Sequence, residues 1–232
     1  MKKNAMLKIA AILMVAVLLT TCAVSSTFAK YYTNGTASAP QTARVAKWGV
    51  TIASEVDGVF AQKFHGGVAS DKTTGLDVAA AEGSDNLLAP GTANGGRIKA
   101  TLTGTPEVAF QFTTVANVSL TGWNVDGSYY CPLVVTVNGT PVTPGATKDE
   151  FAANIAEAIS TAGTKKFAAG TAISTVASQV EVQVAWSWAF ETGEGAAIAE
   201  NNAKDNKLAA LDATNTISIA VTQSATQIQN YS

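Results

Sequence analysis

The sequence predicts an all-β protein, a jelly-roll-like antiparallel β-sandwich with one short helix inserted. The clearest sign is residues 179–191, where large apolar residues alternate strictly with small or polar ones (Val180, Val182, Val184, Trp186, Trp188, Phe190). A period of two is typical of a strand with one buried face. A face this large needs an equally large partner surface, which a second sheet packed face to face supplies. The Trp residues leave open a second interpretation, an aromatic platform for a ligand.

Further alternating stretches recur between turn signals, as in sandwiches and barrels. We expect strands in residues 44–52, 58–64, 98–102, 107–120, 129–137 and 217–221. Pro90–Gly91 suits a type II turn, and Asn138–Gly139 is a strong hairpin signal. Residues 70–85 form a polar excursion, and residues 196–211 suit either a loop or a short helix.

One segment has helical periodicity. Thr147 and Glu150 make a capping box, and Gly163 is placed to end the helix. Three apolar residues follow the cap at four-residue spacing and form a single stripe (Phe151, Ile155, Ile159). We expect this helix to lie across an edge or open end of the sandwich, where it shields exposed backbone.

Composition and charge limit the class of protein. The chain has 232 residues, and its charged fraction of 14% is low against the usual value of about 25%. Residues 1–29 hold three of the 15 basic residues and none of the 17 acidic ones, so the remainder is acidic. With no basic patch, nucleic acid is not expected as a partner. Residues 43–232 suffice for one β-sandwich domain, preceded by a flexible segment, residues 30–42.

The first 29 residues read as a secretory signal peptide. A short basic region precedes an apolar run, residues 9–19, and Thr27 and Ala29 stand at the specificity positions for cleavage before Lys30. The apolar run is shorter than the roughly 20 residues of a spanning helix. We therefore expect a secreted protein that contacts the membrane only through its leader before cleavage, an uncleaved anchor being the alternative. A lipoprotein at Cys22 is disfavoured because Thr21 precedes it.

Cysteine usage excludes an internal disulfide in the mature chain. After cleavage Cys131 stands alone. It shares its alternation with Leu133, Val135 and Val137, which favours a buried, inert thiol. An intermolecular disulfide or a reactive thiol is the alternative.

The residues that common catalytic and cofactor sites need are missing. His65 is the only histidine, and the chain contains neither a His-Glu-x-x-His motif nor a P-loop. Asp205, Asn206 and Asp212 could hold calcium, but without EF-hand spacing we expect solvated loop residues. The sequence thus predicts no catalytic residue, no metal and no cofactor, and a protein that is not an enzyme.

Several short motifs carry a resemblance. Residues 26–33, Ser-Thr-Phe-Ala-Lys-Tyr-Tyr-Thr, are similar to leaders cut by the SipW type of signal peptidase. Residues 44–50, 88–92 and 186–191 resemble a first strand, an Ala-Pro-Gly turn and a Trp-x-Trp-x-Phe-Glu strand in the TasA/camelysin family of Gram-positive biofilm-matrix and surface proteins. Residues 205–209 match that family's Asp-Thr-x-Leu-Gly motif only in degraded form.

The resemblance implies a secreted structural protein of the extracellular matrix or cell surface, with a jelly-roll-like fold. It also implies head-to-tail self-assembly into fibres by strand donation from the N-terminus, after cleavage by a SipW-type peptidase. In residues 30–42 three threonines suit strand geometry, and two tyrosines could anchor in a groove (Tyr31, Tyr32, Thr33, Thr36, Thr42). A surface binding module for carbohydrate or protein is the alternative. A camelysin-like metallopeptidase fits less well, because the usual zinc ligands are missing.

Overall fold

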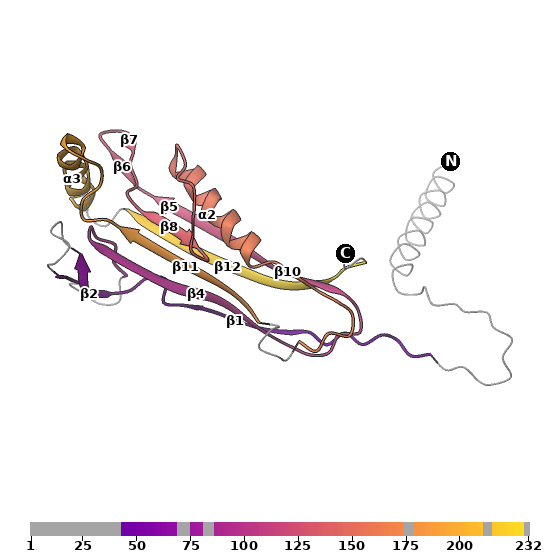
Figure 1. Cartoon of the computed structure of the whole chain (residues 1–232). Helices are drawn as coiled ribbons and strands as arrows, with labels where there is room; N and C mark the ends of the chain where they lie inside the picture. The colour runs from indigo at the N-terminus through magenta and orange to yellow at the C-terminus, as the bar shows by residue number, and fades with distance from the viewer. Residues whose placement is uncertain (1–42, 69–74, 81–85, 174–178, 211–214, 230–232) are drawn as a thin grey trace, which may run out of the picture. The chain divides into compact units, whose positions relative to one another are not determined.

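The structure, a computed structural model, describes residues 43–68, 75–80, 86–173, 179–210 and 215–229. Its two main sheets are antiparallel throughout and pack against each other as a sandwich (Figure 1). The all-β prediction is therefore confirmed. The predicted signal peptide, residues 1–29, lies outside the described residues.

The first sheet has five strands in the order β1 (Thr51–Asp57), β4 (Thr92–Thr103), β11 (Val180–Trp188), β8 (Val134–Val137), β9 (Thr140–Pro141). The second has three, in the order β10 (Lys165–Phe167), β5 (Phe110–Thr121), β12 (Thr216–Gln227). Two hairpins stand apart, β2 (Lys63–Val68) with β3 (Gly75–Ala79) and β6 (Asn124–Val125) with β7 (Ser128–Tyr129). The helices are α2 (Lys148–Ala162) and α3 (Ala196–Ala209).

Side chains from both sheets share the hydrophobic core. At one end, Leu102 of β4 lies in the same buried cluster as Phe110 of β5 and Phe167 of β10. The Phe110 and Phe167 rings stack with their centroids 4.7 Å apart. The larger cluster joins β4, β11 and β8 to β5 and α2.

The alternating row of β11 is buried as the sequence predicts. Val180, Val182, Val184, Trp186 and Trp188 are all 5% exposed or less. The row ends at Trp188, however, so the expectation that Phe190 belongs to it was wrong. The partner strand β4 begins at Thr92, which is paired with Trp188, so the ladder has no continuation. Phe190 is half-buried beyond the strand end.

Both predicted turns are present. Thr92 N–H donates to the Ala89 carbonyl across 3.1 Å, and Gly91 at the third turn position has φ +80°, as a type II turn requires. Asn138 and Gly139 have φ of +49° and +77°, the pair of positive values that marks a type I′ hairpin. The second turn joins β8 to β9 and sets their register, whereas the first precedes β4, where the Gly91 N–H donates to the Trp188 carbonyl across 2.8 Å.

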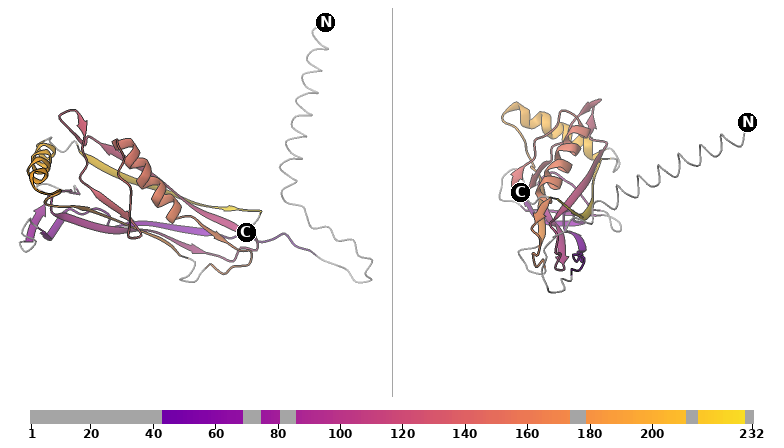
Figure 2. Two further views of the ribbon diagram at one scale, coloured as in Figure 1. Left: turned by 45° about the horizontal axis from the view of Figure 1, so that its top comes forward. Right: turned by 90° about the vertical axis from the view of Figure 1, so that its right-hand side faces the viewer.

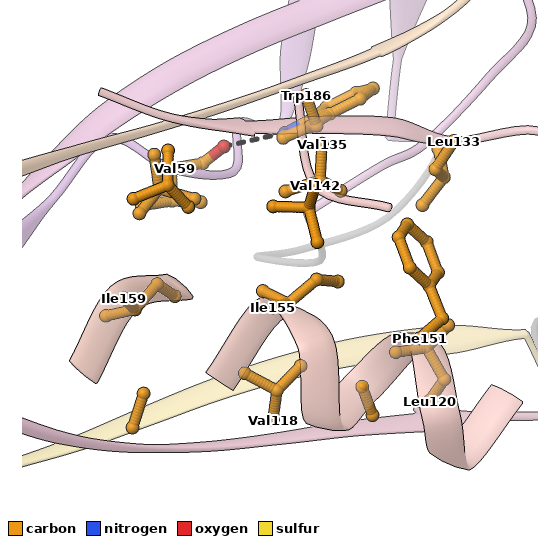
Figure 3. Packing of buried hydrophobic residues seen from close by; sticks show 14 of the residues in the cluster. Val59, Val118, Leu120, Leu133, Val135, Val142, Phe151, Ile155, Ile159 and Trp186 are labelled. Carbon is orange, nitrogen blue, oxygen red and sulfur yellow. Dashed lines mark hydrogen bonds between the residues drawn. The ribbon is translucent and has the colours of Figure 1, made fainter. Parts of the chain in front are cut away.

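Helix α2 closes one long side of the sandwich. Thr147 caps it by accepting from the Glu150 N–H across 3.2 Å, and Gly163 ends it, as predicted. Figure 3 shows the apolar stripe of α2 between the two sheets, facing Val135 on one side and Val118 on the other. The stripe consists of Phe151, Ile155 and Ile159, and Leu120, Leu133 and Val142 belong to the same buried cluster. The Ser160 hydroxyl accepts the Ala116 N–H of β5 across 3.0 Å. The helix thus satisfies backbone at a sheet edge, as expected.

The first strand begins later than its alternation indicates. Residues 44–50 are irregular, and β1 starts at Thr51. Lys47 instead exchanges backbone contacts with Glu107, accepting from its N–H at 2.9 Å and donating to its carboxylate at 2.7 Å. These bonds hold the segment against a loop, so it forms no ladder with β4.

Three other expectations needed correction. The strand expected over residues 129–137 is interrupted, because Tyr130 N–H donates to Trp123 and Pro132 has no N–H to offer a ladder. The strand expected over 58–64 begins only at Lys63, since Gly58 turns with φ +67°. Residues 70–85 contain β3, and residues 196–209 take the helical alternative as α3.

Candidate functional site

The residues predicted for processing and polymerisation lie outside the described residues. They are Thr27, Ala29, Lys30, Tyr31, Tyr32, Thr33, Thr36 and Thr42. The structure therefore does not test these residues, and it describes only the edges of the two sheets to which a donated strand could add. The sequence predicted strands over residues 44–52 and 217–221, which overlap two of these edges, but it did not predict that either lies at an edge.

Strand β1 is an edge whose inward side chains are only partly covered, because Ile52 is half-buried against the core but the inward residues after it are exposed. Val56 is paired with Ile98 of β4, and both side chains point to the same face. Ile98 is 1% exposed, whereas Val56 is 53% exposed. The next inward residue, Ser54, is also exposed, although its partner Ala100 is fully buried. The core therefore reaches β1 at Ile52 but does not cover Ser54 or Val56.

Strand β12, the edge of the other sheet, shows the same incomplete burial. Ile217, Ile219 and Val221 are half-buried, and their cross-strand partners on β5 are at most 8% exposed (Leu120, Val118 and Ala116). The inward rows of β1 and β12 are both less buried than those of their neighbouring strands. We call these two strands the open side of the sandwich (Figure 2).

The tryptophans do not form an exposed platform. Trp123, Trp186 and Trp188 are 1%, 4% and 5% exposed, and only Trp48, at 45%, reaches solvent. The Trp186 indole N–H donates to the Val59 carbonyl across 2.8 Å, which fixes the ring in the core. This arrangement removes the row of aromatic faces on which the carbohydrate interpretation depended.

A buried carboxyl joins α3 to the strands at one end of the sandwich. Asp205, 4% exposed, accepts the Tyr130 hydroxyl across 2.9 Å. Burial raises the pKa of the Asp205 carboxyl, while the Tyr130 hydroxyl and the Trp188 indole oppose that rise. The expectation of a solvated loop residue was therefore wrong for Asp205. Asn206 lies on α3 and is exposed, and Asp212 falls outside the described residues.

The structure also places the two other reactive residues that the sequence analysis named, Cys131 and His65. Cys131 is a free, half-buried thiol, and burial raises its pKa to about 11, so it is protonated at neutral pH. His65 lies within β2. Within the described part of the chain, no three His, Cys, Asp or Glu side chains gather as metal ligands.

An open groove of about 710 Å³ runs between α2 and the β8–β9 hairpin. Glu157 is the only carboxylate among its lining residues, and the other polar ones are Asn138, Thr140, Thr143, Asn154 and Thr161. A single carboxylate offers no pair of carboxyl groups for general acid–base catalysis.

Comparison of the chain with protein-family models, with curated proteins and with solved structures gives no match. Among the helices that the structure describes, none has the length and apolar character needed to cross a membrane.

Proposed function

We propose that this protein is a secreted, non-enzymatic structural subunit that assembles into extracellular fibres or matrix. After removal of the leader, residues 30–42 of one subunit add as a strand to β1 of the next. The observation that carries the proposal is the inward row of β1, where Val56 is 53% exposed beside an Ile98 that is 1% exposed. A strand paired with β1 would cover this row and satisfy the backbone of an edge strand.

Charge supports β1 as the acceptor. The outward face of β1 carries Glu55 and Asp57, whereas residues 30–42 contain one lysine and no acidic residue. Acidic residues on an edge discourage pairing between identical copies but admit a weakly basic segment. The contact joins different surfaces of the two subunits, so it propagates head to tail instead of closing as a dimer. The similarity of the leader to those of the TasA/camelysin family points the same way.

Two proteins test the role of the segment. Protein beginning at Lys30 is expected to form filaments in electron micrographs, whereas protein beginning at Ala43 stays folded by circular dichroism and forms none. Equal polymerisation by the two proteins, or by neither under any condition, would remove residues 30–42 from the mechanism.

A matched pair of substitutions tests the acceptor. Ser54→Lys places a charge in the inward row of β1, and Ala53→Lys places the same charge on the outward face of that strand. Both native side chains are small and exposed, so both variants are expected to fold. A labelled peptide of residues 30–42 should bind the Ala53→Lys protein and lose binding to Ser54→Lys by at least about tenfold in fluorescence anisotropy. Equal binding to both would show that β1 is not the acceptor.

A further inference from the structure

The two sheets have four edge strands, and three of them carry features that discourage pairing with another copy. β9 has two residues and includes Pro141, and β10 has three residues of which two are lysines. β1 carries Glu55 and Asp57. Short length, proline and charge are the usual protections of natural sheet edges.

Strand β12 has none of these protections. It is 12 residues long, TISIAVTQSATQ, with no charge, proline or glycine. Its pairing with β5 runs over all 12 residues without a register shift, so the edge carries no bulge. The outward residues of β12 are exposed and consist of Thr, Ser and Ala (Thr216, Ser218, Ala220, Thr222, Ser224, Thr226). A long, regular, uncharged edge is a template for pairing.

The backbone groups that point to this edge can be identified. The Ala116 N–H of β5 donates to Ser160 of α2, so it points away from β12. Ala116 is opposite Val221, and in an antiparallel ladder such a pair exchanges no hydrogen bonds. The N–H and C=O of Val221, and of its inward neighbours Ile217 and Ile219, therefore point to the open edge. Backbone groups alternate in direction along a strand, so those of even-numbered residues should point to β5. Ile228 agrees with this, because its N–H donates to the Ala109 carbonyl.

We propose that β12 pairs antiparallel with β12 of a second copy of this chain across a two-fold axis. The hydrogen-bonding groups belong to the odd-numbered residues, so pairing joins odd positions to odd positions and keeps both outward faces on the same side. The half-buried Ile219 and Val221 of each copy then continue one apolar row across the junction. Because an antiparallel pair of identical strands is self-complementary, the contact closes as a dimer.

This contact goes beyond the proposed fibre. Strand donation uses β1 in the first sheet, whereas this pairing uses β12 in the second, so the two contacts use the backbone groups of different strands. Head-to-tail donation builds a filament, and β12 pairing joins two filaments side by side.

Charges introduced on β12 test the pairing in the secreted protein. Ala220→Lys/Thr222→Lys and Ala220→Glu/Thr222→Glu each place two like charges on the exposed outward face of β12. Like charges opposite each other destabilise an antiparallel pair. Val115→Lys/Asn117→Lys is the matched control, because those exposed residues lie directly opposite Thr222 and Ala220 but on the inner strand β5.

Sedimentation equilibrium measures pairing of soluble protein, and electron microscopy measures it as paired filaments. Wild type and the β5 control are expected to pair, each β12 variant to weaken pairing by at least about tenfold, and an equimolar Lys and Glu mixture to restore it. Circular dichroism checks that every variant is folded.

Three results would overturn the proposal: wild type that never pairs, β12 variants that pair like wild type, or a mixture that does not recover. If protein beginning at Ala43 loses the pairing, residues 30–42 occupy β12 and the proposal also fails. Filament formation and the Ser54→Lys variant report on strand donation, so failure of one idea is distinguishable from failure of the other.

Discussion

The two long sides of the sandwich are completed in different ways. On one side α2 covers the gap between the sheets, its stripe is buried, and Ser160 accepts a backbone N–H of β5. On the open side, β1 and β12 present inward rows that are only partly covered, and Val56 is 53% exposed. Inward-facing apolar side chains are thus buried on the α2 side and only partly buried on the open side. One side is thus completed within the described part of the chain, and the other is the side to which both proposals above assign a second chain.

The largest effect on the free energy of unfolding is expected at Trp186, in the core between the two sides. Trp186→Ala removes a side chain that is 4% exposed, its edge-to-face contact with Phe64, and the hydrogen bond to Val59. We expect a loss of about 3–5 kcal/mol in the free energy of unfolding, measured by urea denaturation. Trp48→Ala, at a residue 45% exposed, is the control and should cost clearly less. A loss below about 1 kcal/mol for Trp186→Ala would return the aromatic-platform interpretation.

The contrast between the sides is tested by one substitution made on each. Ile155→Ala on α2 removes a fully buried side chain, with an expected loss of about 2–5 kcal/mol. Ile219→Ala on β12 removes a half-buried side chain. Because folding buries less apolar surface there, we expect the free energy of unfolding to fall by less than about 2 kcal/mol. Equal losses for these two variants in dilute protein would mean that the β12 side is as closed as the α2 side.

The same pair of variants responds differently to protein concentration if β12 pairs between copies. The penalty for Ile219→Ala should then grow as pairing becomes complete, because the partner buries more of that side chain. The penalty for Ile155→Ala should stay constant, since α2 already covers it. Unfolding curves recorded over a hundredfold range of concentration measure this difference, and a constant Ile219→Ala penalty would argue against a partner on that edge.

Local chemistry explains which parts of the fold could be predicted. The Thr147 cap, the Asn138–Gly139 hairpin and the β11 row each depend on residues close together in the chain, and the structure contains all three. The start of β1 could not be predicted, because residues 44–50 alternate as well as residues 51–57 do. Which of them pairs with β4 is decided by contacts about 50 residues away, such as the one between the Thr51 and Thr103 hydroxyls.

The candidate site was harder to predict for the same reason. Strands β11 and β12 have similar alternation, and the sequence pattern of a single strand does not show whether it is central or at an edge. The absence of charge along β12 does not mark it as an edge, because the inner strand β5 is uncharged as well. The burial of Asp205 depends on Tyr130, 75 residues away, so no local pattern could indicate it.

The smallest expected effect concerns the end of the sandwich, where α3 packs through a buried carboxyl group. On the closed side α2 packs instead through an apolar stripe. α3 presents Asp205 to Tyr130, and burial raises the pKa of this carboxyl above its ordinary value near 3.8. A raised folded-state pKa means that folding favours the protonated form. The contribution of Asp205 is therefore most favourable below its ordinary pKa, and stability falls as the pH rises from there through the raised value.

Asp205→Asn should remove that dependence. The amide can accept from or donate to the Tyr130 hydroxyl, which itself can do either, so the contact is kept without the buried charge. We expect wild type to lose stability relative to Asp205→Asn in urea denaturation as the pH is raised from about 3.8. Tyr130→Phe should steepen the loss, because the hydroxyl that favours the ionised carboxyl is gone. Parallel pH profiles for wild type and Asp205→Asn would show that ionisation of Asp205 does not change the free energy of unfolding.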